Sequence, residues 1–171
     1  MKTKQKIDIS IGIIYILTGT LFLLFPIYHI TNLKMIFLIA FSIVSLLTLI
    51  QFIINRKTKD YTGLYSFIVN LLFALSMIIV KVQTPKNLAM CLMGWVILMS
   101  LIRLKKSDYY HDRKDRMWKL NLIMLGIFIL AGILTSINLL HESGVQIIII
   151  GYFLFINGIL DIMDPFVKSL I

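Results

Sequence analysis

The sequence predicts an all-α, polytopic membrane protein, with six transmembrane helices arranged as three tandem helical hairpins related by a pseudo-threefold axis. Three observations predict this fold class. Six stretches of the chain contain no Asp, Glu, Lys or Arg over about the thickness of a bilayer. The chain is 59% hydrophobic and 15% charged, which is far too apolar for a soluble domain of 171 residues. Basic residues also gather on alternate connections between the stretches.

Each stretch is interpreted as one membrane helix, because about 20 residues rise about 30 Å and only a helix satisfies its own backbone in lipid. The first stretch follows three lysines, as a secretory signal would, but it is long and five more follow, so we expect it to be retained. The second ends before Arg56, the third before Lys81 and the fourth before Arg103; the fifth begins after Lys119, and the sixth ends before Asp161. The predicted helices cover residues 9–33, 35–55, 61–80, 87–102, 120–140 and 143–160.

The distribution of basic residues predicts the topology. If the helices alternate in direction, 14 of the 17 basic residues fall on one side, and the other side holds only Lys34, Lys81 and Lys86. We therefore expect the N- and C-termini in the cytoplasm and the protein in the cell membrane, and the dense Ile, Lys and Asn content suggests a bacterium. This topology explains the net charge of +9 without nucleic acid. The basic loop at residues 103–119 should lie at anionic headgroups on the cytoplasmic face, in part as a short surface helix.

The helices are expected to pair through short outer loops into three repeats, at about residues 7–55, 61–104 and 117–164 of a single membrane domain, 1–171. Two helices per repeat keep every copy in the same orientation, so the axis should run along the membrane normal. Matching pairs support the repeat: Ala40-Phe41, Gly94-Trp95 and Gly151-Tyr152.

Small residues are interpreted first as packing seams, where helices approach closely in lipid. Gly12 and Gly19 lie seven residues apart on one helix face, and Gly151 and Gly158 have the same spacing.

These features together resemble the HdeD-like acid-resistance membrane proteins. The resemblance is carried by Gly19 with Pro26 at the outer end of the first helix, the Gly–aromatic starts of the even helices, the run Gly-Tyr-Phe-Leu-Phe-Ile-Asn-Gly at residues 151–158, and the basic aromatic loop. It implies a six-helix inner-membrane protein linked to stress, with no settled mechanism and no catalytic residues to carry over. The chain departs from the pattern at the proline, which the later copies replace with Lys81 and a residue near Asn138.

Three side chains are candidates for polar contacts or a relay inside the membrane. Asn70 and Asn157 are the amides set deepest in apolar stretches, and each is expected to bond a neighbouring helix, with a polar pathway as the alternative. Asp161 follows Asn157 by one turn, and Asp164 comes just before Pro165, which is expected to end the helix. Acids at a helix C-terminus oppose its dipole, so we expect them to pair with the basic ends of the second and fourth helices. The alternative for Asp161 is a proton-responsive gate.

His29 and His141 are expected on the outer side, where they could sense acid, although interfacial histidines usually face water and headgroups. His111 is expected on the inner side, so the three histidines cannot form one metal site. Cys91 is the only cysteine, and it is interpreted as a small apolar residue within the fourth helix. No metal or other cofactor is predicted.

Enzymatic activity is not expected, because no phosphate-binding loop, HExxH or catalytic triad stands at a workable spacing. Three functions remain open. The first is a structural or protective role in stress, such as acid, as the resemblance implies. The second is a small channel or transporter for protons or a small solute along the axis. The third is an accessory subunit of a membrane complex. Each allows a homo-oligomer or a membrane partner beside the lipid bilayer.

Overall fold

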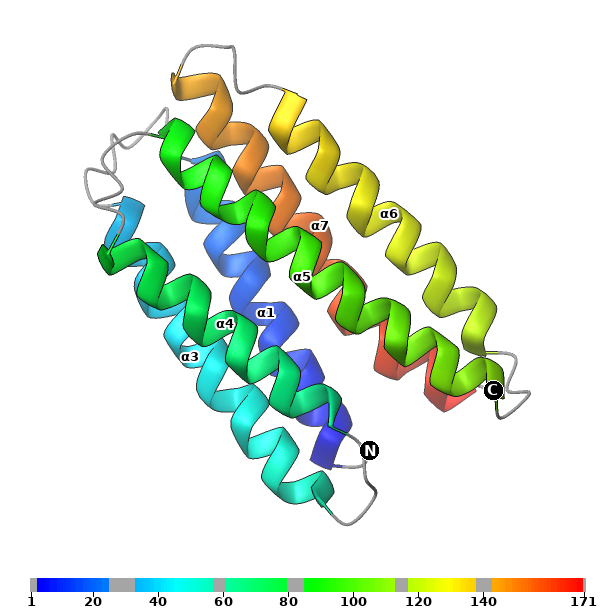
Figure 1. The fold of residues 1–171 in the computed structure, drawn as a ribbon. Coiled ribbons are helices and arrows are strands. Elements are labelled where there is room, and N and C mark those ends of the chain that lie inside the picture. The colour runs from blue at the N-terminus through cyan, green and yellow to red at the C-terminus, as the bar shows by residue number, and fades with distance from the viewer. Residues whose placement is uncertain are drawn as a thin grey trace.

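The computed structural model describes residues 3–24, 33–56, 61–79, 85–112, 117–137 and 143–170 (Figure 1). These residues form six helices that are each long and apolar enough to cross a bilayer. Large apolar side chains remain exposed on the outer faces of all six, as expected where lipid covers the protein. The chain is therefore a multi-pass membrane protein. The helices are α1 (Thr3–Leu23), α3 (Leu33–Asn55), α4 (Thr62–Ile79), α5 (Pro85–Asp112), α6 (Met117–Ile137) and α7 (Ser143–Leu170).

The helices form a closed ring in which each packs against the next and α7 returns to α1. Both termini lie at the same end of the bundle, which we call the terminal end (Figure 1). The most extensive contacts join α1 to α7, α3 to α4 and α5 to α6, and α5 also contacts α7 across the interior. The helices expected to pair as hairpins, such as α4 with α5, are in contact but less extensively. The pseudo-threefold relation stays a prediction.

The ring closes through a glycine seam between α1 and α7. A Cβ atom on Gly158 would lie 2.5 Å from the carbonyl oxygen of Gly12, and one on Gly19 would lie 2.7 Å from that of Gly151. The two backbones are therefore in direct contact, which no larger residue would permit. The interpretation of these glycines as a packing seam is confirmed.

An aromatic cluster fills the middle of the ring. Trp95 on α5 is 2% exposed, and its ring contacts one aromatic ring from each of the other five helices, with centroids 5.3 to 6.2 Å apart. Tilted and edge-on rings at such distances add favourable interactions to their burial. The partners of Trp95 in this cluster are Tyr15, Phe41, Phe73, Phe128 and Phe153.

This cluster corrects the predicted register of the third repeat. Phe41 and Trp95 are buried, as their matching positions require, but Tyr152 is 56% exposed and its neighbour Phe153 takes the place in the core. Gly94 also faces open space, unlike Gly151. The prediction was wrong by one residue, because a Gly–aromatic pair does not reveal which side of the helix faces inward.

Helices α5 and α7 continue past the predicted membrane stretches that end at residues 102 and 160. Residues 103–112 extend α5, and α6 begins at Met117, so the expected loop at 103–119 with a separate surface helix was wrong. Pro165 lies inside α7 and does not end it. Arg103 and Lys106 of α5 form ion pairs with Asp161 and Asp164 of α7, so these helices need not stop to expose those four charges. Residues 113–116 lie outside the described part of the chain.

Candidate functional site

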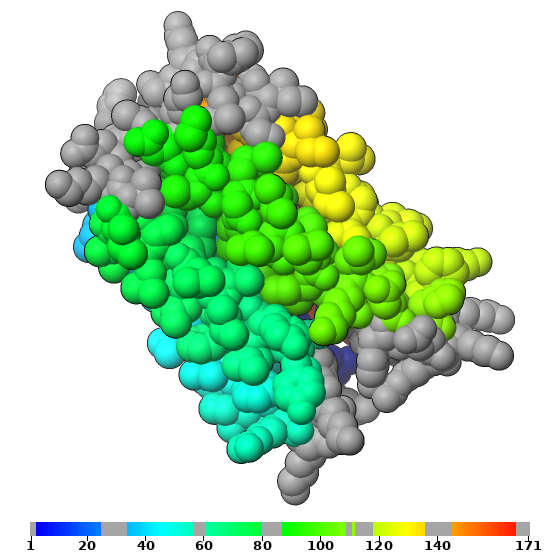
Figure 2. Space-filling model, in the orientation of Figure 1, coloured from blue at the N-terminus to red at the C-terminus, as the bar shows by residue number. Residues whose placement is uncertain are grey.

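A cavity of about 100 Å³ lies inside the ring near the terminal end. One face each of α1, α3, α4, α5 and α7 lines it, because its residues recur every three or four positions along each helix. Figure 2 shows α1, in dark blue, through a gap between α4 and α5 near this end. The polar residues of the lining are Lys4, Asp8, Tyr15, Thr48, Gln51, Thr62, Ser66, Asn70, Arg103, Lys106, Asp161 and Asp164.

The cavity extends to the aromatic cluster in the middle of the ring. Along α1 its lining runs from Lys4 to Tyr15, which is about 16 Å at 1.5 Å per residue, or about half the bilayer core. Tyr15 and Asn70 form its deep end, since both contact Trp95. The interior of the ring is therefore polar toward the terminal end and aromatic at its middle.

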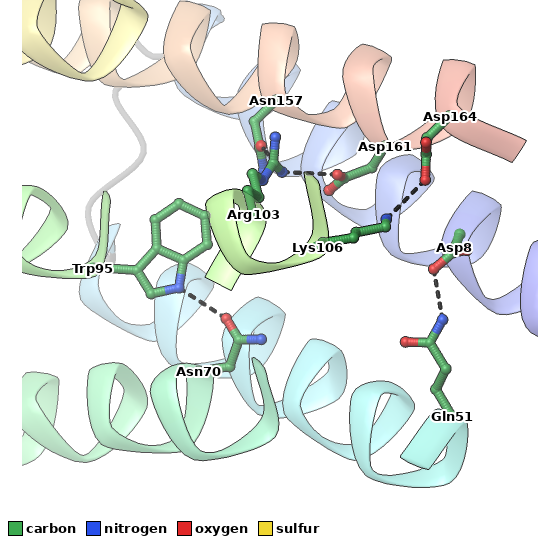
Figure 3. A network of polar contacts seen from close by, with 9 residues as sticks. All are labelled: Asp8, Gln51, Asn70, Trp95, Arg103, Lys106, Asn157, Asp161 and Asp164. Atoms are coloured by element: carbon green, nitrogen blue, oxygen red, sulfur yellow. Dashed lines mark hydrogen bonds and ion pairs between the residues drawn. The ribbon is translucent and has the colours of Figure 1, made fainter. Parts of the chain in front are cut away.

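Two ion pairs join α5 to α7 across this interior (Figure 3). The Arg103 guanidinium donates to Asp161 Oδ1 at 2.8 Å and to Asn157 Oδ1 at 2.7 Å. It also lies 4.1 Å from the ring centroid of Phe128, so its flat face is covered as well. Lys106 Nζ donates to Asp164 Oδ2 at 2.8 Å. The prediction that the acids of the last helix pair with the basic end of the fourth is confirmed.

The second helix contributes to this polar region differently from the prediction. Arg56 is exposed, and Lys57 lies outside the described residues. Helix α3 enters the polar cluster one turn earlier, through Gln51, whose Nε2 donates to Asp8 Oδ1 of α1 at 2.7 Å (Figure 3). Gln51 is buried, and a cation at its position would need a second partner to offset the cost of burying a charge. An uncharged amide avoids that cost.

Asn70 bonds the neighbouring helix, as predicted. Trp95 Nε1 donates to Asn70 Oδ1 at 2.8 Å, which ties α4 to α5 beside the aromatic cluster (Figure 3). The Nδ2 atom of Asn70 and the hydroxyl of Tyr15 are buried and have no hydrogen-bond partner among the residues that the structure describes. Buried polar atoms are normally paired, with protein or with ordered water. The deep end of the cavity therefore has hydrogen-bonding capacity that the protein itself leaves unused.

The structure brings the three membrane candidates into one region. Asn70 and Asp161 line the cavity, and Asn157 reaches it through Arg103. His29 and His141 lie outside the described residues, so their proposed pH sensing stays a prediction. His111 is exposed and packs edge-on against Trp118 at the terminal end. Ser100 donates to the carbonyl of Val96 in its own helix.

Sequence reasoning missed Asp8, Tyr15 and Gln51 as members of the site. A usable signal was present, since polar residues recur at helical spacing in the halves of the helices nearest the termini, as Thr48 and Gln51 do. Asp8 lies just before the first apolar stretch and Gln51 lies within the second, and neither stretch identifies the other residue as a partner. In the structure each is the other's partner, which no single helix reveals.

A smaller cavity of about 40 Å³ lies behind the ion pairs, toward α6. It shares Arg103 and Asp161 with the first cavity, and Asn121 of α6 lines its far wall with its Nδ2 atom unpaired. The two ion pairs thus form a partition between two polar spaces.

Both spaces are suited to binding through hydrogen bonds and balanced charge. Within the described ranges, no group of three or more His, Cys, Asp or Glu side chains could hold a metal ion. No protein-family model matches the chain, and comparison with curated proteins and with solved structures finds no match either.

Proposed function

We propose that this protein carries a small polar solute across the membrane, with the cavity as its binding site. The observation that supports this proposal is a polar cavity that enters the ring from the terminal end and stops at the aromatic cluster. A permanently open channel needs a polar path through the whole bilayer, whereas a carrier needs access from one side at a time. A cavity that stops at the aromatic cluster supports the second of these.

The joint between α5 and α7 supports movement of this kind. These helices contact each other only modestly across the interior, and their contact includes ion pairs between long side chains. Because these pairs line the cavity, a solute or water that enters it can hydrogen-bond to the charged groups and offset part of the cost of separating them. The seam between α1 and α7 is rigid by contrast, so the motion would leave that part of the ring in place.

The terminal end would face the cytoplasm. Most basic residues of the chain lie on this side if the helices alternate, and positive charge concentrates at the cytoplasmic face. In the cell membrane the cavity would then be open to the cytoplasm in the described state.

The test is uptake by proteoliposomes. Purified protein is reconstituted, and entry of labelled small polar solutes and of protons is followed over time. We expect uptake of at least one solute, with a rate at least tenfold lower in Asp161→Asn, because that change removes the charge that holds Arg103. Tyr152→Phe is the control, since Tyr152 faces outward. Rates equal to protein-free liposomes for every solute would refute transport.

A second candidate is the structural or protective stress role that the family resemblance implies. The glycine seam and the aromatic cluster favour it, because both make the bundle compact and resistant to opening. A deletion strain challenged at low pH tests this role. Full rescue by Asp161→Asn would support a structural role, and loss of rescue would instead connect survival to the cavity.

A further inference from the structure

The deep end of the cavity presents two hydrogen-bond donors that have no acceptor within the described part of the chain. Tyr15 is 2% exposed and Asn70 is not exposed at all, and both line the cavity. The Tyr15 hydroxyl and Asn70 Nδ2 are each unpaired. Leaving such buried groups without a partner is unfavourable, so we expect something that enters the cavity to satisfy them.

The donor character of Asn70 follows from the chemistry of its partner. An indole N–H can only donate, so the Asn70 atom at 2.8 Å from Trp95 Nε1 must be the carbonyl oxygen. The amide therefore presents its NH₂ group to the cavity. The same reasoning applies to Asn157. Its oxygen accepts from the donor-only guanidinium of Arg103, and its Nδ2 has no partner in the described ranges. Both amides therefore have an N–H group that can donate to an acceptor on a ligand.

The charges of the lining disfavour an ionic ligand. Three cations, Lys4, Arg103 and Lys106, are matched by three carboxylates, Asp8, Asp161 and Asp164, so the formal charge of the lining is zero. A charged ligand would either break an existing pair or add an uncompensated charge within the membrane, and both are costly. An uncharged ligand requires neither.

The volume limits the size of the ligand. An apolar cavity of about 150 Å³ holds benzene, which has six non-hydrogen atoms, so about 100 Å³ accommodates a molecule of about four. We infer that the deep end of the cavity binds a small uncharged solute through a carbonyl or hydroxyl oxygen, which accepts hydrogen bonds from Asn70 Nδ2 and the Tyr15 hydroxyl. This inference rests on the proposed function, because it names the solute class for the same cavity.

The chain supplies a reporter for this binding. It contains two tryptophans, and Trp95 is bonded to Asn70 while Trp118 lies at the terminal end. In a Trp118→Phe background, the indole emission therefore reports on the deep end alone. The protein in nanodiscs is titrated at constant ionic strength with acetamide, acetate and acetamidinium, which have the same size and differ in charge. We expect a saturable change with acetamide, and at least tenfold weaker responses with the two ions.

Tyr15→Phe then tests the binding geometry. This substitution removes one donor while keeping the ring that packs on Trp95. We expect acetamide to bind about threefold to tenfold more weakly, with thermal stability unchanged or raised, because the lost hydroxyl had no partner in the empty cavity. Tyr152→Phe, on the outer face, is the matched control and should bind as the parent does.

The outcomes separate this inference from the proposed function. Acetamide binding without uptake in proteoliposomes would support the inference and refute transport. Uptake that is accompanied by preferential binding of acetate or acetamidinium would support transport and overturn the inference. The absence of any saturable response to acetamide would also overturn it, and would indicate that water alone occupies the deep end. Equal affinity in the parent and Tyr15→Phe would refute the assigned donors.

Discussion

Replacing Gly158 by alanine should destabilise the bundle, because the seam between α1 and α7 has no room for a methyl group. The new Cβ atom would lie 2.5 Å from the carbonyl oxygen of Gly12 and 2.8 Å from the backbone nitrogen of Ile16. Ordinary contact begins at 3.4 Å, so the two helices must separate locally by about 0.9 Å (3.4 − 2.5). Backbone atoms cannot rotate away as a side chain could, so the cost should be that of overpacking, about 1–3 kcal/mol.

The assay is the free energy of unfolding in mixed micelles of a mild detergent and SDS, followed by tryptophan fluorescence. Gly94→Ala is the matched control, because nothing lies within 4 Å of its added Cβ atom and alanine has the higher helix propensity. We expect Gly94→Ala to match or exceed the parent and Gly158→Ala to fall below it by about 1–3 kcal/mol. Equal stability of the two variants would show that α1 and α7 are not in backbone contact, and the argument for a rigid seam would then fail.

Three further predictions concern the polar and aromatic interior. Arg103→Leu should cost about 1–3 kcal/mol of stability, because it leaves the half-buried Asp161 carboxylate unpaired. Adding Asp161→Leu should recover part of that loss, and strictly additive costs in this double-mutant cycle would contradict the pair. Trp95→Ala should cost about 3–5 kcal/mol of stability, because Trp95 contacts all five neighbouring aromatic rings. It should also make proteoliposomes leak protons, as measured by a pH-sensitive dye inside them. Liposomes that do not leak would show that the aromatic cluster does not block proton passage through the ring. Asn70→Leu should lower the free energy of unfolding by about 1–3 kcal/mol, because it leaves the Trp95 indole N–H unpaired. In the same unfolding assay, combining Trp95→Phe with Asn70→Leu should cost less than the sum of the two single changes.

The sequence identified several residues of the candidate site, but few of the contacts between them. Asn70 and Asn157 stand out because an amide in lipid needs a partner, and Asp161 stands out because an acid at a helix end opposes the dipole. Trp95 did not stand out as a central residue, because an apolar stretch does not show which of its faces meets the other helices. The one-residue offset at Tyr152 has the same origin.

The sequence by itself determined the membrane class, the six helices and the accumulation of basic residues on one side. These properties depend on local composition, since lipid forces each apolar stretch into a helix whatever its neighbours are. It also determined which glycines form a seam, because spacing by seven places them on one face. Only the tertiary structure decided that α7 closes the ring on α1, that Arg103 and Lys106 extend a membrane helix, and that Asp8 meets Gln51. The physical reason is that a charged or polar side chain can lie inside a membrane bundle only with its partner, and that partner comes from another helix.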